Sequence, residues 1–313
     1  MPQTLPLSVN APAIQWYPGH IAKAEKALQE ALAKVDLVIE VRDARIPQAT
    51  GHPRLRRWIS GKQHLLVLNR RDMVPVAAQQ AWSDWFRGRG QPVWWCDAKA
   101  GTGVKQLQQA AIRAGESLNR RRADRGMKPR PVRALMLGFP NVGKSALINR
   151  LVRQKVVESA RRAGVTRSLR WVRLGQELDL LDAPGVLPPR LDDQQAALRL
   201  ALCDDIGQAA YDNEGAALAF VQLLQQLEPM AASGVPAGLL ERRYRIPLAD
   251  LPAGGPDVES WLVAAAERHT GGDTLRMATK LLDDFRCGRL GAIALDLPPG
   301  LPAPSAAGQQ TNG

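Results

Sequence analysis

The first 190 residues alternate short apolar runs with stretches of helical spacing. Apolar runs rich in β-formers occupy residues 36–41, 63–68, 92–96, 132–138, 168–174 and 177–182. Polar or turn residues follow these runs, helical stretches alternate with them, and an Ala/Lys/Glu-rich helical stretch at 20–34 precedes the first run. Buried strands that alternate with helices are typical of a parallel sheet with helices on its faces. The pattern therefore predicts an α/β domain with a mostly parallel, six-stranded sheet.

The pattern changes after about residue 190. Residues 192–203, 213–228, 257–270 and 273–287 are apolar at helical spacing, with no strand-like run between them. We therefore predict a small all-helical C-terminal domain over residues 191–296, after an α/β domain over 16–190. The remaining predictions are an irregular segment at 1–15, an exposed basic linker at 119–133 and a disordered tail at 297–313.

Composition narrows the class of protein further. Hydrophobic residues make up 45% of the 313 residues, which is enough for a core. The three cysteines (Cys96, Cys203 and Cys287) are too few for a disulfide framework, so a reducing compartment is expected. No apolar run reaches the length of a membrane span, and no secretory signal is visible at the N-terminus. We expect a cytoplasmic protein without membrane contact, and a monomer by default.

The charge is unevenly distributed along the chain. Residues 1–190 carry 33 lysines and arginines against 14 acidic residues, whereas residues 191–313 carry 9 against 16. The net charge of the whole chain is +12. A basic region of this size favours a polyanionic partner, most simply RNA, over a generally basic surface with no such partner.

A phosphate-binding loop follows the fourth apolar run. The segment Gly138-Phe139-Pro140-Asn141-Val142-Gly143-Lys144-Ser145 matches Gly-x-x-x-x-Gly-Lys-Ser and leads into a helical stretch. The glycines let backbone N–H groups surround the phosphates, and Lys144 reaches the β- and γ-phosphates. The residues expected around the phosphates are Asn141, Val142, Gly143, Lys144, Ser145, Ala146, Thr166 and Gly185.

Two further segments complete the predicted phosphate and metal site. Asp182-Ala183-Pro184-Gly185 ends the sixth apolar run, where Asp182 fits a carboxylate of a Mg²⁺ site and the Gly185 N–H fits the γ-phosphate. Between the phosphate loop and this segment lies Thr166, which can close the Mg²⁺ shell. The predicted Mg²⁺ residues are thus Ser145, Thr166 and Asp182.

The base-recognition residues lie in the first third of the chain. In Asn69-Arg70-Arg71-Asp72, the Asp72 carboxylate can accept both guanine N–H groups, a donor pair that adenine lacks. Asn69 is expected to connect this segment to the phosphate loop. In Asp97-Ala98-Lys99, the Ala98 N–H would meet guanine O6 and the Lys99 stem would cover the base.

The order of these motifs is unusual, because most GTPases carry the phosphate loop before the base-recognition segments. The order here predicts a circularly permuted GTPase domain. Such a permutation is physically reasonable, since the ligand of an open α/β sheet lies beyond the carboxyl ends of the strands whatever their order in the chain. It also places the Asp182–Gly185 segment directly before the helical region, so nucleotide state could pass into that region.

This motif order resembles the ribosome biogenesis GTPase A (YlqF-type) family. Three further segments are similar to that family, and together they extend the resemblance over roughly residues 16–295: Trp16-Tyr17-Pro18-Gly19-His20-Ile21-Ala22-Lys23-Ala24, Asp43-Ala44-Arg45-Ile46-Pro47 and Leu282-Asp283-Asp284-Phe285-Arg286 with Gly288, Leu290 and Gly291. Three positions depart from the family's usual residues. Arg70 replaces a lysine, and its planar group is expected to stack differently on the base. Asp97 replaces a frequent serine, and Ala163 replaces a frequent proline.

The resemblance implies a GTP hydrolase that acts late in assembly of the large ribosomal subunit. Such a protein would bind pre-ribosomal RNA in its GTP state, be stimulated by the subunit and leave as GDP. The resemblance also implies catalytic roles for His20, Lys144 and Gly185, because Val186 cannot orient water as a glutamine does. Asn141 is implied as a ligand of a K⁺ ion beside the phosphates. Two other functions stay open at this point: a GTP-dependent binding switch with negligible hydrolysis, and an ATP-dependent P-loop kinase or ATPase, which Asp72 disfavours.

Overall fold

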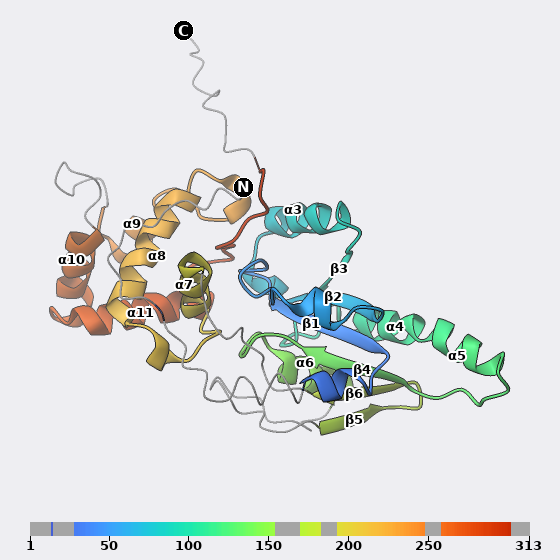
Figure 1. Ribbon diagram of the computed structural model, residues 1–313. Coiled ribbons are helices and arrows are strands. Elements are labelled where there is room, and N and C mark those ends of the chain that lie inside the picture. Colours follow the sequence, from blue (N-terminus) through green and yellow to red (C-terminus); the bar gives the residue numbers. More distant parts are fainter. Residues whose placement is uncertain (1–13, 15–27, 154–169, 183–192, 248–257, 302–313) are drawn as a thin grey trace, which may run out of the picture.

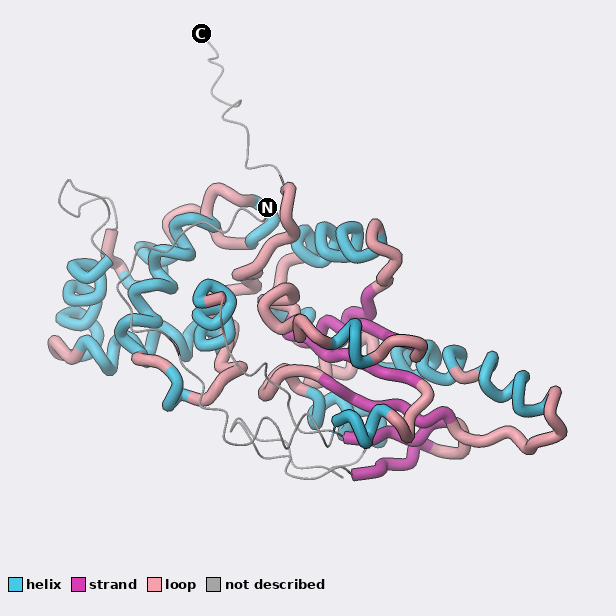
Figure 2. Tube along the Cα trace, viewed as in Figure 1, coloured by secondary structure: helices cyan, strands magenta, loops and turns pink. Residues whose placement is uncertain are grey.

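A computed structural model describes Ile14 and residues 28–153, 170–182, 193–247 and 258–301. It contains a six-stranded sheet and a group of helices that lies beyond one end of the sheet (Figures 1 and 2). The strands are β1 (Leu37–Asp43), β2 (Gln63–Asn69), β3 (Val93–Cys96), β4 (Val132–Leu137), β5 (Arg170–Leu174) and β6 (Leu178–Asp182). All six strands were predicted, and the α/β fold class is confirmed.

The strand order in the sheet is β3-β2-β1-β4-β6-β5. Every neighbouring pair is parallel except β5 and β6, which are antiparallel. The short turn after Leu174 explains this exception, because a few residues can join antiparallel neighbours whereas a parallel pair needs a crossover.

Alternating residues of β1 face two separate cores. Leu37, Ile39 and Val41 of β1 join the larger core with α4 (Val104–Ala114) and α6 (Lys144–Val152). Val38, between them in sequence, joins a smaller core on the other face, which includes the helical residues 28–32 and α2 (Leu55–Trp58). A sheet covered on both faces needs apolar residues on both sides of each strand, which explains the continuous apolar runs.

The remaining elements of this part are η1 (Arg71–Met73), α3 (Val76–Arg87) and α5 (Glu116–Ala123). Helix α3 buries Trp82 and Phe86 against β2. Helix α5 overlaps the start of the segment predicted as an exposed linker at 119–133. Its residues are largely exposed, as expected, but they form a helix. Arginines favour helix as much as they favour exposure, so charge alone did not reveal it.

The second part of the chain is helical. Its elements are α7 (Gln194–Leu202), η2 (Gln208–Ala210), α8 (Asn213–Leu227), η3 (Ala231–Ser233), α9 (Leu239–Tyr244), α10 (Val258–Thr270) and α11 (Thr274–Arg286). Aspartates cap three of the helices: Asp193 accepts from Ala196 N, Asp212 from Gly215 N and Asp273 from Arg276 N. The four predicted helices are confirmed, and the short α9 is an addition. No helix in the part of the chain that the structure describes is long and apolar enough to cross a membrane.

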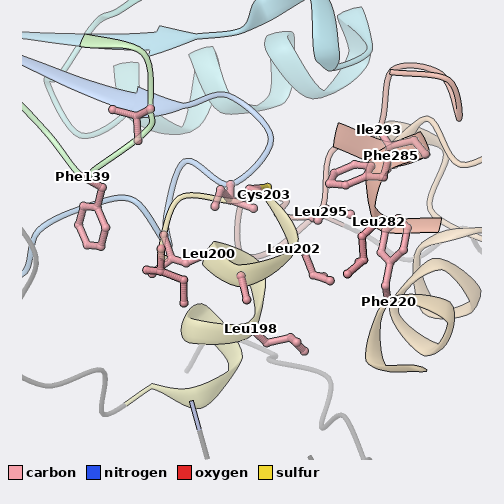
Figure 3. Close-up of a cluster of buried hydrophobic side chains, with 14 of the residues drawn as sticks. Phe139, Leu198, Leu200, Leu202, Cys203, Phe220, Leu282, Phe285, Ile293 and Leu295 are labelled. Carbon is pink, nitrogen blue, oxygen red and sulfur yellow. The ribbon is translucent and has the colours of Figure 1, made fainter. Parts of the chain in front are cut away.

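The two parts share one continuous core. Phe139 of the phosphate loop, Leu200 and Cys203 at the end of α7, and Phe285 of α11 belong to the same buried cluster (Figure 3). The helical part therefore packs directly against the sheet part. The predicted domain boundaries at 190/191 and 296/297 are not tested by this arrangement and stay a prediction.

The segment after α11 returns to the sheet part, which the helical pattern did not predict. Ile293 N donates to Met73 O at 2.9 Å, and Leu295 N donates to Arg45 O at 3.0 Å. Trp82 Nε1 donates to Asp296 O at 3.0 Å. These three hydrogen bonds hold the C-terminal end of the helical part against the sheet part.

Candidate nucleotide-binding site

The carboxyl ends of the parallel strands bring the predicted site residues to one edge of the sheet. In the strand register Asp43 is opposite Asn69, and Asn69 is opposite Cys96, the residue before Asp97. Met136, just before the phosphate loop, is opposite Asp182. Polar side chains from four strands therefore meet at the edge where α/β sheets bind ligands.

The phosphate loop is tightly packed around its glycines. Gly143 has a φ of 96°, and a Cβ there would lie 2.2 Å from Asn69 Nδ2. A Cβ at Gly138 would lie 2.2 Å from the backbone oxygen of Val41. Helix α6 begins at Lys144, so its first N–H groups point toward the loop. This is the backbone arrangement that binds phosphate oxygens.

Lys144 and Asp182 are two buried charged groups behind this loop. The Lys144 ammonium donates to the oxygens of Phe139 at 2.7 Å and Gly138 at 3.2 Å. Burial lowers the pKa of Lys144 to about 8, although Asp182 and Asp205 raise it. Burial raises the pKa of Asp182 to about 6 against the opposing effect of Lys144. Both groups are thus poorly neutralised by the protein, and negatively charged phosphates with a cation would stabilise them in their charged forms.

Asp182 also fits a metal site by its hydrogen bonding. Its Oδ1 is buried and has no hydrogen-bond partner among the described residues. A buried carboxylate oxygen without a donor costs free energy, and a hydrated Mg²⁺ ion supplies what it lacks. Ser145, half-buried in the first turn of α6, provides the neighbouring hydroxyl.

Asn69 connects the base-recognition segments to the phosphate loop. Its Nδ2 donates to Val142 O at 2.9 Å, and its Oδ1 accepts from Ala98 N at 3.1 Å. Segments from β2, from β3 and from the phosphate loop are thereby joined through one buried side chain. This geometry supports the link that was expected of Asn69, while the contact of the Ala98 N–H with guanine O6 stays a prediction.

Asp72 and Lys99 lie at the exposed rim beside this bridge. Partial burial and the nearby Asp97 carboxylate raise the pKa of Asp72, so the two base-recognition segments are close to each other. Asp97 Oδ1 accepts from Lys99 N at 2.7 Å and from Ala100 N at 3.0 Å. Aspartate therefore closes the turn at the position where the family often has serine.

Arg70 makes contacts that the sequence analysis did not predict. Its backbone is left-handed, with a φ of 65°, and its guanidinium lies 3.1 Å from Asp43 Oδ2 and donates to Asn141 O. The side chain therefore points toward the phosphate loop and β1, and its role beside the base stays a prediction. The planar guanidinium carries several N–H donors and can bind Asp43 and Asn141 at once. A lysine at this position could not do so in the same geometry.

Asn141 connects the phosphate loop to the helical part. Its φ of 54° is left-handed, and its Nδ2 donates to Asp204 O at 2.7 Å. Asp204 follows the end of α7. The predicted K⁺ ligand is therefore also a structural contact between the loop and the helices.

A buried charge cluster that the sequence analysis did not assign lies behind Arg70. Arg45 donates to both carboxylate oxygens of Asp43, at 3.0 and 2.7 Å, and to Cys203 O at 3.0 Å. Asp205 is fully buried, with no hydrogen-bond partner for its carboxylate among the described residues, and burial together with Asp43 raises its pKa well above the usual range. The similarity of residues 43–47 to the family was the only sequence signal for this cluster.

Four residues with predicted roles lie outside the described residues: His20, Thr166, Gly185 and Val186. Ala163 lies there as well. Their roles stay predictions.

The fold and this site define a class of protein: a P-loop GTPase whose phosphate loop is closed by an asparagine from an Asn-x-x-Asp segment. A family model described as a 50S ribosome-binding GTPase matches residues 133–226. The chain is 41% identical over 189 residues to the ribosome biogenesis GTPase A of Priestia megaterium, covering 60% of this chain and 66% of that protein. It is 34% identical over 243 residues to the protein of the same name from Bacillus pumilus, covering 76% and 81%.

The chain belongs to the ribosome biogenesis GTPase A family, and it is a GTPase of ribosome biogenesis. A solved GDP-bound structure of TM YlqF matches 87% of this chain and 98% of its own, with a TM-score of 0.57 and 22% identity. That likeness confirms the fold, including the helical C-terminal part.

The family-like segment near the C-terminus has a structural role here. Asp284 is buried and accepts from Arg243 at 2.8 Å, from the Tyr244 hydroxyl at 3.0 Å and from Arg289 at 2.9 Å. Arg286 donates to the last carbonyls of α7, those of Ala201 and Leu202. These side chains hold α7, α9 and α11 together, beside the point where α7 meets the nucleotide site.

Proposed function

We propose that this GTPase binds and hydrolyses GTP to drive a late step in assembly of the large ribosomal subunit. The observation that carries the proposal is the Asn69 bridge: one side chain fastens the base-recognition segments to a phosphate loop behind which Lys144 and Asp182 are buried. The names of the matching relatives, and of the family model that matches residues 133–226, supply the ribosomal context.

Each residue of the site has a proposed task. Backbone N–H groups of Asn141 to Ala146 and the Lys144 ammonium bind the phosphates, and Asp72 accepts the two guanine N–H groups. Ser145, Thr166 and Asp182 would hold Mg²⁺, which neutralises the charge of the β- and γ-phosphates. GTP binding adds anionic groups beside the buried Lys144, whose pKa burial lowers in spite of Asp182 and Asp205.

Hydrolysis is proposed to use two groups outside the described residues. The Gly185 N–H binds the γ-phosphate, and His20 orients the attacking water, because Val186 has no polar group for this task. A K⁺ ion held with the help of Asn141 would add positive charge beside the phosphates. The large subunit is proposed to stimulate hydrolysis by completing this arrangement.

The partner is proposed to be ribosomal RNA of the maturing large subunit. The excess of lysines and arginines in residues 1–190 supports binding to a polyanion. GTP-bound protein would bind the RNA and GDP-bound protein would leave it. We propose that the protein acts as a monomer in the cytoplasm.

The experiment is a hydrolysis assay with and without purified large ribosomal subunits, in KCl and in NaCl. We expect the subunits to stimulate hydrolysis and K⁺ to increase the rate further. His20→Ala should lower the stimulated rate without weakening GTP binding.

A second function, a GTP-dependent binding switch with negligible turnover, is favoured by Val186 alone. It predicts that His20→Ala changes no rate and that subunits bind in the GTP state without being released by hydrolysis. Absence of both stimulation and binding by subunits in either salt would contradict the ribosomal proposal.

A further inference from the structure

The segment between α4 and β4 forms a projecting basic arm, defined here as residues 116–131. Figure 1 shows α5 at the end of the molecule opposite to the helical part. The arm leads into the amino end of β4, whereas the nucleotide site lies at the carboxyl end of that strand. Basic residues here therefore have no place in the nucleotide site.

The base of the arm is firmly fixed. Arg130 donates to both carboxylate oxygens of Asp36, each at 2.8 Å. Asn119 Nδ2 donates to Arg130 O at 3.0 Å, and Asn119 Oδ1 accepts from Arg130 N at 3.1 Å. At Gly115, between α4 and α5, a Cβ would lie 1.8 Å from a methyl group of Val132. The helix and the returning chain are thus held side by side against the sheet.

The tip of the arm is closed by its own bonds. The Arg122 guanidinium donates to Lys128 O at 3.2 and 3.1 Å, and Met127 N donates to Arg122 O at 2.9 Å. Gly126 takes a φ of 70°, which the tight reversal requires. Arg122 therefore builds the tip and Arg130 builds the base, while Arg121 donates to Ser117 O of its own helix at 3.3 Å.

Four basic side chains remain exposed on this arm: Arg120, Arg121, Arg125 and Lys128. None of them forms an ion pair with any described residue. Asp124 is the one acidic residue between Glu116 and Pro131. Like charges held close together repel each other, so an arm that gathers them with only Glu116 and Asp124 as acids is stabilised by an external polyanion.

We propose that this arm binds the phosphate backbone of RNA. The proposal rests on the proposed ribosomal function and locates a contact away from the nucleotide site. Guanidinium groups bind phosphates in a bidentate manner, and three of the four exposed cations are arginines. A membrane surface fits less well, because Met127, at 40% exposed, is the arm's one large exposed apolar side chain among the described residues. Insertion into lipid needs a broader apolar face.

The test compares two variants that lose the same charge. The arm variant is Arg120→Gln/Arg121→Gln/Arg125→Gln, which keeps the Asn119, Arg122 and Arg130 bonds that shape the arm. The control variant is Arg87→Gln/Lys105→Gln/Arg113→Gln, which removes three exposed cations from α3 and α4. A third variant, Arg120→Lys/Arg121→Lys/Arg125→Lys, keeps the charge and separates loss of binding from loss of folding.

The full-length proteins are titrated with a labelled RNA duplex of about two helical turns at several KCl concentrations between roughly 50 and 200 mM. For the arm variant we expect a slope of log affinity against log salt that is smaller by roughly two to three, and about tenfold or more weaker binding near 100 mM KCl. The control variant and the lysine variant should stay within about threefold of the wild type. GDP affinity should be unchanged in all three variants.

Equal losses in the arm and control variants would overturn the proposal, because net charge would then account for binding. Arm-dependent binding of equal strength to polyglutamate or to phosphatidylglycerol vesicles would also overturn the assignment to RNA. The same titration with large ribosomal subunits separates the two proposals. If subunits bind the wild type and the arm variant alike, the arm proposal fails and the ribosomal function stands. If subunits fail to bind the wild type while duplex binding depends on the arm, the ribosomal function fails and the arm proposal stands.

Discussion

At the scale of single residues, side-chain amides and buried charges determine how the site is assembled. Asn69 joins three segments because an amide carries a donor and an acceptor on one short side chain. Lys144 and Asp182 carry charges that the surrounding protein does not fully compensate. The free energy of these two charged groups therefore depends on the phosphates and the cation that bind beside them.

The first prediction concerns Asn69. We expect Asn69→Ala to weaken GDP binding about tenfold to thirtyfold, since it removes two hydrogen bonds worth about 1 kcal/mol each from the loop that surrounds the phosphates. Titration with a fluorescent GDP analogue measures this. Asn119→Ala is the matched control, because Asn119 also makes two backbone bonds but lies in the basic arm. Equal effects of the two substitutions on GDP affinity would contradict the assigned role of Asn69.

The second prediction concerns the pH dependence of stability in the nucleotide-free protein. The pKa of Asp182 is about 6 in the folded protein and 3.8 in its ordinary state, so the folded form binds more protons between about pH 4 and 6. This contribution to stability is full below about pH 4 and is lost as the pH rises through 6. Its size is on the order of 3 kcal/mol.

Urea unfolding of the wild type and of Asp182→Asn at pH 4, 5, 6 and 7 isolates this contribution as the difference between the two proteins. The wild type should lose stability relative to the variant over this range. A constant difference across the range would show that the pKa of Asp182 is not raised.

At the scale of elements, a few buried contacts decide how the helices meet the sheet. Arg45, on the loop after β1, is fully buried between Asp43, the end of α7 and the Phe285 ring, whose centroid lies 5.3 Å from the guanidinium carbon. Burial lowers its pKa, but Asp43, Cys203 and Asp205 together raise it by more, so Arg45 stays charged. A buried charge of this kind is tolerable only while its partner is present.

The third prediction follows from this contact. Arg45→Leu should lower the free energy of unfolding by about 3–5 kcal/mol, because it leaves the Asp43 carboxylate buried with fewer donors. Chemical unfolding at neutral pH measures the change. Arg87→Leu breaks the exposed pair of Arg87 and Asp84 and should cost less than about 1 kcal/mol. A loss below 1 kcal/mol for Arg45→Leu would mean that the buried pair does not hold the two parts together.

At the scale of the whole molecule, the nucleotide site and the helical part are physically connected. Asn141 donates to Asp204 O, and the Arg70 guanidinium lies between Asp43 and the buried Asp205, 3.9 Å from the latter. The phosphate loop therefore contacts the end of α7 directly. Ordering of the loop by nucleotide should also order this junction.

The fourth prediction tests this connection by hydrogen exchange. GDP should slow amide exchange at residues 142–147 and also at 203–206, while α10 stays unchanged. Asn141→Ala should remove the protection at 203–206. Asn213→Ala, which affects an asparagine within the helical part, should leave that protection in place. Protection confined to the phosphate loop in the wild type would contradict the connection.

The sequence by itself determined the type of every strand in the described part of the chain, the four main helices of the C-terminal part and the main motifs of the site. Apolar periodicity and glycine spacing are local properties, so they can be read from the amino-acid sequence alone. The sequence pattern also predicted the contact of Asn69 with the phosphate loop. A segment at the carboxyl end of one parallel strand lies at the same end of the sheet as a loop that follows another. The helix α5 was missed because exposed arginines carry no periodic signal.

Only the tertiary structure decided the rest. Arg70 turns toward Asp43 and Asn141, and Arg45 reaches Cys203, which lies 158 residues further along the chain. The last segment returns so that Trp82 meets Asp296. These pairings depend on which elements pack side by side, and a charged side chain finds its partner by distance in space. No local pattern encodes that distance, since the same arginine could have faced a base, a phosphate or solvent.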